Sequence, residues 1–398
     1  MGGVTKGGQE FSQTRYRRDG FTWAAFAALT AFGFLNAVLG PALPYLRAVE
    51  HISYLVGSLH QVAFAIGGGV AALIAVHAKR DLGRAVVIRV GLLGAAAAGL
   101  ALAYGDTAAV TVLAALFVSL LGTSAPVRLW AALADAHGAQ RTVAMTEGEV
   151  SVSLGGIIAP LLVGGLAATV LTWRFAFVIG GALVGAAVVA SATVRIPRSA
   201  PGPATQPRPS AQPETPWWTP TLVLIFAVVA LEFSLSFWLA SYLNDSVGLD
   251  RGLAATMVGG LYAANLAGRL VASRLARRTS TVRVLAGAIA TGLVGLPILL
   301  VATNPAVAGI GLAVAGAGIG ATFPLASSLH VASAACTADS AVGQVLAVAA
   351  IGQVMGPLTV AVIAQGGGLR TGLLILPALA VLAAAALGRH PHRNRPSG

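Results

Sequence analysis

Residues 155–161 read GGIIAPL, and residues 352–358, which lie 197 positions further along, read GQVMGPL. The same displacement brings other pairs together: Tyr45 falls on Tyr242, Arg80 on Arg277 and Glu147 on Gln344. Matches in one register over such a distance indicate two copies of one unit. Each copy contains about six long apolar runs, so the repeat predicts two bundles of membrane helices. Duplicated bundles of this kind hold a solute site between their halves, which makes transport the first functional hypothesis.

The composition supports a membrane location before any motif is considered. Hydrophobic residues make up 57% of the chain, charged residues only 10%, and the mean hydropathy is +0.83. Soluble domains carry roughly 25% charged residues. The 49 glycines fit the same interpretation, because small residues let helix backbones approach closely in lipid. We therefore expect an all-α membrane protein.

Windows of about 20 apolar residues predict twelve transmembrane helices in two pseudo-symmetric six-helix bundles. The first bundle spans 21–196, with helices expected at 21–46, 53–77, 86–104, 108–133, 145–170 and 175–195. The second spans 217–388, with helices expected at 217–243, 252–273, 282–302, 306–330, 341–364 and 371–388. The polar, Pro-rich stretch at 197–216 is expected to be a linker between them. An N-terminal segment (1–20) and a tail (389–398) complete the chain.

The Lys and Arg residues predict the orientation, because cytoplasmic loops carry the excess of positive charge. With the N-terminus inside, 19 of the 25 fall in cytoplasmic segments. Both chain ends and the linker are then cytoplasmic in a multi-pass protein of the inner, or plasma, membrane. A net charge of +12 along that membrane surface indicates contact with anionic lipids, and it argues against nucleic-acid binding.

Other classes of function lack the residues that they need. No G-x-x-x-x-G-K-[ST] loop occurs and the only lysines are Lys6 and Lys79, so ATP is not expected to drive the protein. The seven histidines are scattered, with only His390 and His392 close together, so we expect no metal site. No serine nucleophile elbow is present, and the single Cys336 carries no recognisable chemistry. We expect neither enzyme activity nor a cofactor.

Three local patterns carry a family resemblance. Residues 76–84 read VHAKRDLGR. The fifth predicted helix (145–170, helix 5) contains the glycine and proline cluster that begins at Gly155, and Trp173-Arg174-Phe175 leads into the sixth (175–195, helix 6). With the two six-helix halves and the central linker, they resemble the major facilitator superfamily over nearly the whole chain. The resemblance implies alternating access between the halves and an aromatic and cationic anchor at the start of helix 6. It also implies a conformational latch in the first loop, carried by Arg80, Asp81, Gly83 and Arg84.

The helix 5 cluster is similar to the exporter-associated family pattern g-x-x-x-G-P-x-x-G-G. A proline frees a backbone carbonyl, and small residues let another helix pack against the resulting bend. We interpret Gly155, Gly156, Pro160 and Gly164 as packing residues of this bend. The alternative to an export signal is a bend that importers and exporters share.

Charged residues inside predicted helices are candidates for proton coupling, because charge at lipid depth is costly and is normally functional. Arg128 on helix 4 and Glu147 on helix 5 fall at mirrored depths and can pair. Glu149 points about 200° away from Glu147, so at most one of these acids faces Arg128. The pair is either a switch that breaks when a proton or solute binds, or a structural tie.

Glu232 is the sharpest of these candidates. It lies midway along helix 7 and no cation is near it in the sequence. Desolvation favours the neutral acid, which lets the group cycle between charged and neutral forms. We predict Glu232 as the proton carrier, with a hydrogen-bonded packing acid as the alternative.

Other polar and aromatic residues within the helices are candidates for a solute cavity: Asn36, His60, Gln61, Trp238, Tyr242, Tyr262, Asn265 and Arg269. Asn265 and Arg269 are four residues apart and share a helix face. For Arg269 the alternative is contact with lipid phosphate, for His60 it is packing, and for the aromatic rings it is the membrane interface.

These observations predict a monomeric secondary transporter that moves a small organic solute between two six-helix halves. The apolar helices and the helix 5 pattern favour proton-coupled export of an amphiphilic compound. Uptake of a sugar, organic acid or other nutrient is the alternative within this class. A non-transporting membrane receptor or a lipid-moving scaffold is the alternative from another class.

Overall fold

The computed structural model describes residues 16–77, 83–197, 219–334, 336 and 338–390. The first half contains α1 (Gly20–Ala37), α2 (Leu39–Glu50), α3 (Tyr54–His77), α4 (Arg84–Tyr104), α5 (Ala108–His137), the 3-10 turn η1 (Gly138–Gln140), α6 (Arg141–Ala167) and α7 (Phe175–Ala192). The second half contains α8 (Pro220–Asp245), α9 (Arg251–Ala276), α10 (Thr281–Leu300), α11 (Pro305–Ile319), α12 (Thr322–Ser333), α13 (Ala338–Gly372) and α14 (Ile375–Gly388). Most predicted helix ends lie within about four residues of the observed ones. Of the residues described, none forms a strand.

Two of the membrane spans are broken, which the apolar windows did not predict. The helices α1 and α2 meet at Val38, and α11 and α12 are separated by Gly320 and Ala321. Pro41 and Pro324 each lie in the first turn of the following helix, where a missing N–H removes no intrahelical bond. A proline can therefore stay helical there while the preceding residues change direction.

The fourteen α-helices of the described residues form the expected twelve spans. Ten spans of the described chain are long and apolar enough to cross a membrane on their own. The helix α9, which carries Arg251, Arg269 and Arg274, and the 14-residue α14 complete the set. An arginine-bearing helix in this position has to direct charge toward protein or water rather than lipid.

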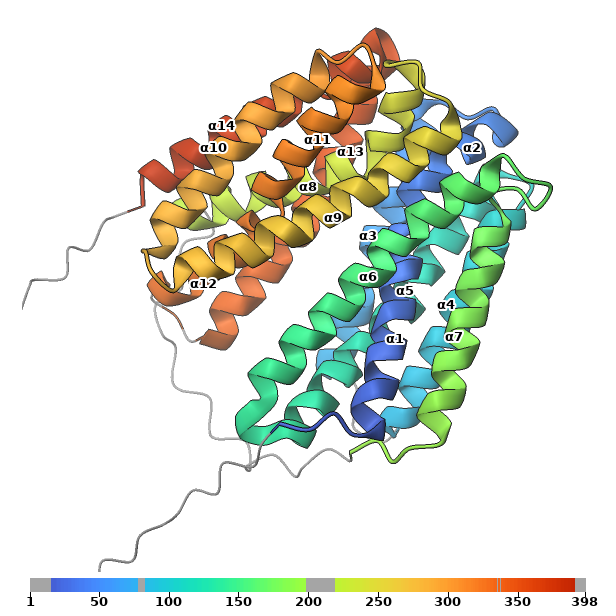
Figure 1. Ribbon diagram of the computed structural model, residues 1–398, viewed down its shortest axis with the longest axis vertical. Helices are drawn as coiled ribbons and strands as arrows, with labels where there is room; N and C mark the ends of the chain where they lie inside the picture. The colour runs from blue at the N-terminus through green and yellow to red at the C-terminus, as the bar shows by residue number, and fades with distance from the viewer. Residues whose placement is uncertain (1–15, 78–82, 198–218, 335, 337, 391–398) are drawn as a thin grey trace, which may run out of the picture.

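The two halves form separate bundles, coloured blue to green and yellow to red (Figure 1). The bundles come together around α2 and separate toward the end where α1 begins. We call the end that carries Arg47 and Asp245 the closed end, and the end where α1 and α8 begin the terminal end.

Polar contacts join the halves at the closed end. Asp245, the last residue of α8, accepts from Arg47 Nη1 at 2.9 Å and from the Tyr54 hydroxyl at 3.0 Å through the same oxygen, Oδ2. The backbone N–H of Leu55 donates to Gln365 Oε1 at 3.4 Å. The first contact is also an ion pair, so the closed end is fastened by charge as well as by packing.

The glycine and proline pattern at 155–165, in the predicted helix 5, lies on α6 of the structure. Its glycines allow close packing on both sides of this helix. A Cβ at Gly155 would overlap the backbone of Thr30 in α1, and one at Gly164 would overlap Thr256 and Gly252 in α9. Gly156, in contrast, faces the space between the halves. Small residues thus bring α6 against its own bundle and against the opposite bundle.

Trp173 and Arg174 were expected to anchor the start of the sixth span, α7 in the structure, at the membrane interface. For Trp173 this prediction is wrong. Trp173 is only 4% exposed and stacks on Tyr45, with ring centroids 5.7 Å apart. Arg174 donates from Nε to the Ala103 carbonyl at 2.7 Å. The predicted linker at 197–216 lies outside the described residues except for Pro197, and so does the tail beyond His390.

Candidate solute cavity

A cavity of about 200 Å³ lies between the two halves, on the terminal side of the closed end. The first half contributes residues from α1, α2, α3 and α6, and the second half contributes residues from α8 and α9. Its polar lining residues are Asn36, Gln61, Ser153, Glu232, Ser236, Tyr262, Asn265 and Arg269. Its large apolar lining residues are Leu39, Phe64, Val152, Phe233, Phe237 and Leu266. A solute held there would meet both hydrogen-bonding groups and aromatic faces.

Glu232 has a cation beside it that its sequence neighbourhood did not reveal. Arg269 Nη2 lies 3.5 Å from Glu232 Oε1, so α9 supplies the counter-charge for the acid on α8. Arg269 Nε also donates to the Gly320 carbonyl at 2.7 Å. Gly320 follows the last residue of α11, and the break in this span leaves its carbonyl available. The interrupted span therefore helps to hold Arg269 toward the cavity.

Asn265 lies one helical turn before Arg269 on the same wall of the cavity. Its side-chain oxygen is buried and has no hydrogen-bond partner. A buried acceptor without a partner costs free energy, which a ligand donor at this position would recover. Asn265 is therefore a candidate contact for a solute.

Three of the predicted cavity residues lie elsewhere. His60 is buried in the first bundle, where its ring nitrogens meet the Gly57 carbonyl at 3.1 Å and the Thr111 hydroxyl at 2.9 Å. Trp238 donates from Nε1 to the Pro357 carbonyl at 3.0 Å, and the Tyr242 hydroxyl donates to the Leu299 carbonyl at 3.0 Å. Their assignment to the cavity was wrong, because helix rotation turns these side chains into the bundles.

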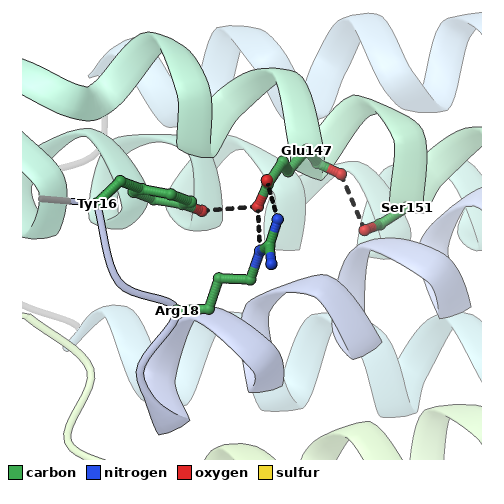
Figure 2. Close-up of polar contacts among 4 residues, drawn as sticks. All are labelled: Tyr16, Arg18, Glu147 and Ser151. Atoms are coloured by element: carbon green, nitrogen blue, oxygen red, sulfur yellow. Dashed lines mark hydrogen bonds and ion pairs between the residues drawn. The ribbon is translucent and has the colours of Figure 1, made fainter.

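The predicted pair between Arg128 and Glu147 is also wrong. Glu147 binds Arg18 instead, with Nε at 2.8 Å from Oε2 and Nη2 at 2.5 Å from Oε1, and it accepts from the Tyr16 hydroxyl at 2.8 Å (Figure 2). The segment before α1 thus crosses to α6, and we call this contact the N-terminal strap. Within the described ranges Arg128 makes no ion pair.

The strap lies at the terminal end, outside the cavity. Burial, together with the hydrogen bond to Glu147 and its charge, raises the pKa of Tyr16 to about 12. The carboxylate of Glu147 likewise raises the pKa of Arg18. Both partners therefore stay protonated as donors over the physiological range of pH.

The remaining charged candidates fall into two places. Glu149 is exposed on α6 and lies within electrostatic reach of Arg269 on the opposite half.

Arg84, from the predicted latch, pairs with Asp135 at 2.6 Å, and Gly83 is the N-cap residue of α4. Arg80 and Asp81 lie outside the described residues, so the latch stays a prediction. No group of three potential metal ligands occurs in the described ranges.

Twelve spans in two bundles, with a polar cavity between them, define the class of multi-pass membrane transporters. The sequence profile of the Major Facilitator Superfamily matches residues 25–344, so the chain belongs to that family. No curated protein sequence matches the chain as a relative.

Solved transporter structures share the fold at low sequence identity. A bacterial homologue of the human lysosomal transporter Spinster, inward-facing and occupied, gives a TM-score of 0.72 at 17% identity, covering 92% of this chain and 95% of that one. A mutant of the nucleoside transporter NupG gives 0.75 at 14% identity, with 93% and 99% covered. A D-xylose-proton symporter gives 0.70 at 13% identity, with 93% and 97% covered. These likenesses establish the fold, and they span several kinds of solute.

Proposed function

We propose that this chain is a proton-coupled secondary transporter that exports a small amphiphilic organic solute. The observation that carries the proposal is the pair of Glu232 and Arg269 in a cavity between two halves that meet at one end only. Charged side chains within membrane spans are costly, and they normally mark a solute or proton pathway. The protein acts as a monomer, because one chain supplies both halves of the cavity.

The orientation of the cavity follows from the charge distribution. Among the described residues, the arginines beside the span ends gather at the terminal end, which we therefore assign to the cytoplasm of a bacterial-type plasma membrane; they include Arg17, Arg18, Arg84, Arg141, Arg195, Arg277 and Arg278. The separation of the bundles at this end then corresponds to an inward-facing state. An export cycle loads solute in this state and releases it after the closed end has opened.

Proton coupling follows from competition for Arg269. When Glu232 is ionised, it attracts Arg269 from 3.5 Å, whereas protonation removes that attraction. Arg269 can then pair with Glu149 on the opposite half, with which it already interacts electrostatically. Pairing across the halves would draw α6 and α9 together at the terminal end. Protonation at Glu232 and closure of the cytoplasmic side are therefore linked. Roles for Glu147 and Arg128 in coupling stay predictions.

The lining residues favour an amphiphilic solute. Phe64, Phe233 and Phe237 offer aromatic surface, while Asn265 offers an unpaired acceptor. Uptake of a polar nutrient is the second candidate, and the amides of Asn36 and Gln61 opposite Asn265 favour it, because a sugar or nucleoside needs several hydrogen bonds.

Proton movement driven by a chosen probe tests both candidates. Purified protein in liposomes that contain a pH-sensitive dye is exposed to ethidium, uridine or D-xylose. We expect ethidium to evoke proton flux in the wild type and not in Glu232→Gln, which keeps the shape of the side chain without its charge. A response to uridine or D-xylose alone would favour uptake, and equal flux in both proteins would contradict proton coupling at Glu232.

A further inference from the structure

A second buried acid lies at the closed end, away from the cavity. Glu50 is the last residue of α2, and both of its carboxyl oxygens are buried without a hydrogen-bond partner. The residue one turn earlier on the same helix is Arg47, which fastens the two halves through Asp245. The solute cavity and its pair of Glu232 and Arg269 do not account for a second buried acid beside this contact.

The groups around Glu50 suit a neutral acid rather than a carboxylate. Thr111 approaches the carboxyl from α5, but neither carboxyl oxygen of Glu50 accepts a hydrogen bond. The Gly57 carbonyl can only accept, so His60 Nδ1 carries a proton and donates to it. His60 Nε2 is then an acceptor, and the Thr111 hydroxyl donates to it at 2.9 Å. The single hydroxyl proton of Thr111 is therefore unavailable to Glu50.

The position of Glu50 in its helix also favours the neutral acid. It lies in the last turn of α2, where unpaired carbonyl groups give the helix a partial negative charge. A carboxylate there would be buried without a donor and repelled by the helix end. With the closed end shut, the surroundings of Glu50 therefore favour the neutral acid over the carboxylate.

Arg47 can stabilise the carboxylate form of Glu50 when the closed end opens. In the closed arrangement its Nη1 binds Asp245 at 2.9 Å, its guanidinium lies 3.9 Å from the centre of the Tyr54 ring, and its Nε is buried without an acceptor. Asp245 belongs to the other half and leaves with it on opening. Arg47 then loses its partner, and Glu50, three residues away on the same helix, is within its reach.

We infer that Glu50 is a second proton site, neutral while the closed end is shut and ionised when it opens and Arg47 exchanges Asp245 for Glu50. One O–H bond of the acid breaks, and its proton passes to the solution on the opened side. The groups that face the exchange are Arg47 on α2, Tyr54 on α3, Thr111 on α5 with His60 behind it, and Asp245 on α8. This inference rests on the alternating access of the proposed function.

The distance across the closed end as a function of pH tests the inference. Nitroxide labels are attached at Val170→Cys and Val301→Cys, which are 98% and 69% exposed and belong to opposite halves, after Cys336→Ser. Double electron–electron resonance is recorded in lipid nanodiscs between about pH 5 and pH 9. We expect the long-distance population to grow relative to the short one as pH rises, by up to about tenfold per pH unit for one linked proton. In Glu50→Gln, the short distance should persist at every pH.

Two controls separate this site from others. Asp106→Asn, an exposed acid near the same end, should keep the response of the wild type. Because the proposed function links Glu232 to the same opening, the pH series is repeated in Glu232→Gln, where the part of the response that depends on Glu50 should remain although ethidium-driven proton flux is lost. A constant distance in the labelled wild type, or an unchanged pH response in Glu50→Gln, would overturn the inference. If the response depends on Glu50 while no probe is transported, the proposed function fails and the proton site stands.

Discussion

Arg269 contacts Glu232 within the second half, and both residues lie on helices of that half, α8 and α9. The pair therefore cannot by itself fasten the two halves together. Under the proposed function, its effect on closure is therefore indirect, through the availability of Arg269 to groups on the first half such as Glu149 once Glu232 is protonated.

The geometry of Arg269 predicts that lysine cannot replace it. The guanidinium reaches the Gly320 carbonyl with Nε and Glu232 with Nη2 at the same time, whereas an ammonium group is a single point charge. We expect Arg269→Lys to lower ethidium-driven proton flux by about tenfold or more, with little change in melting temperature. Arg274→Lys, on the exposed part of the same helix, serves as the control and should transport normally. Unchanged flux in Arg269→Lys would argue against a positioned guanidinium.

The N-terminal strap predicts a small, salt-sensitive contribution to stability. The side chains of Arg18 and Glu147 are 49% and 26% exposed, so water screens their attraction. A double-mutant cycle with Arg18→Gln and Glu147→Gln should give a small coupling between the two side chains, which decreases further at high salt. Arg17→Gln is the matched control, since Arg17 is exposed one residue before the strap arginine.

Transport by the same variants separates the strap from coupling. If Glu147 acts only through the strap, Arg18→Gln and Glu147→Gln should affect proton flux equally and slightly. A loss of flux in Glu147→Gln alone would assign this carboxylate to the coupling mechanism, as the sequence first suggested.

The sequence predicted the features that depend on composition and order along the chain. The duplication, the spans and the intramembrane acid Glu232 follow from hydropathy and from the 197-residue displacement. The partner of Glu232 does not, because Arg269 is 37 residues away and their contact depends on how α8 and α9 are rotated. Rotation likewise turns Trp238 into its bundle rather than into the cavity.

The partner of Glu147 was missed for a different reason. The polar residues before α1 lie outside the predicted spans, so hydropathy gives them no place beside helix 5 and points only to Arg128 on the adjacent helix. The structure shows that a short segment outside the spans can compete with a neighbouring helix for a charge. The break that exposes the Gly320 carbonyl was equally hidden, because its residues are small and apolar.

Tyr16 gives a prediction for alkaline pH. Its pKa is raised to about 12 from an ordinary value near 10, so the folded protein favours the neutral phenol. This contribution to stability is fully present below about pH 10 and is lost as the pH rises toward 12. We expect a tyrosinate titration by ultraviolet absorbance to lose one late-ionising group in Tyr16→Phe. A group that disappears near pH 10 instead would contradict burial of the phenol in the strap.

Two adjacent glycines of α6 predict how closely the halves must approach at the closed end. A Cβ at Gly164 would overlap Thr256 and the Gly252 backbone of α9, whereas one at Gly165 would meet nothing within 4 Å. Backbone cannot yield as a flexible side chain can, so Gly164→Ala should destabilise the closed arrangement by about 1–3 kcal/mol. Gly165→Ala should be neutral or slightly stabilising, because alanine is the better helix former.

The labelled pair at positions 170 and 301 measures this effect directly. Gly164→Ala should increase the long-distance population at a given pH, while Gly165→Ala should match the parent protein. The comparison is well controlled, since the two variants add the same methyl group at consecutive positions of one helix. Equal distance distributions in the two variants would mean that close packing at Gly164 does not hold α6 against α9, and that the polar contacts of the closed end, such as Arg47 with Asp245, keep it shut.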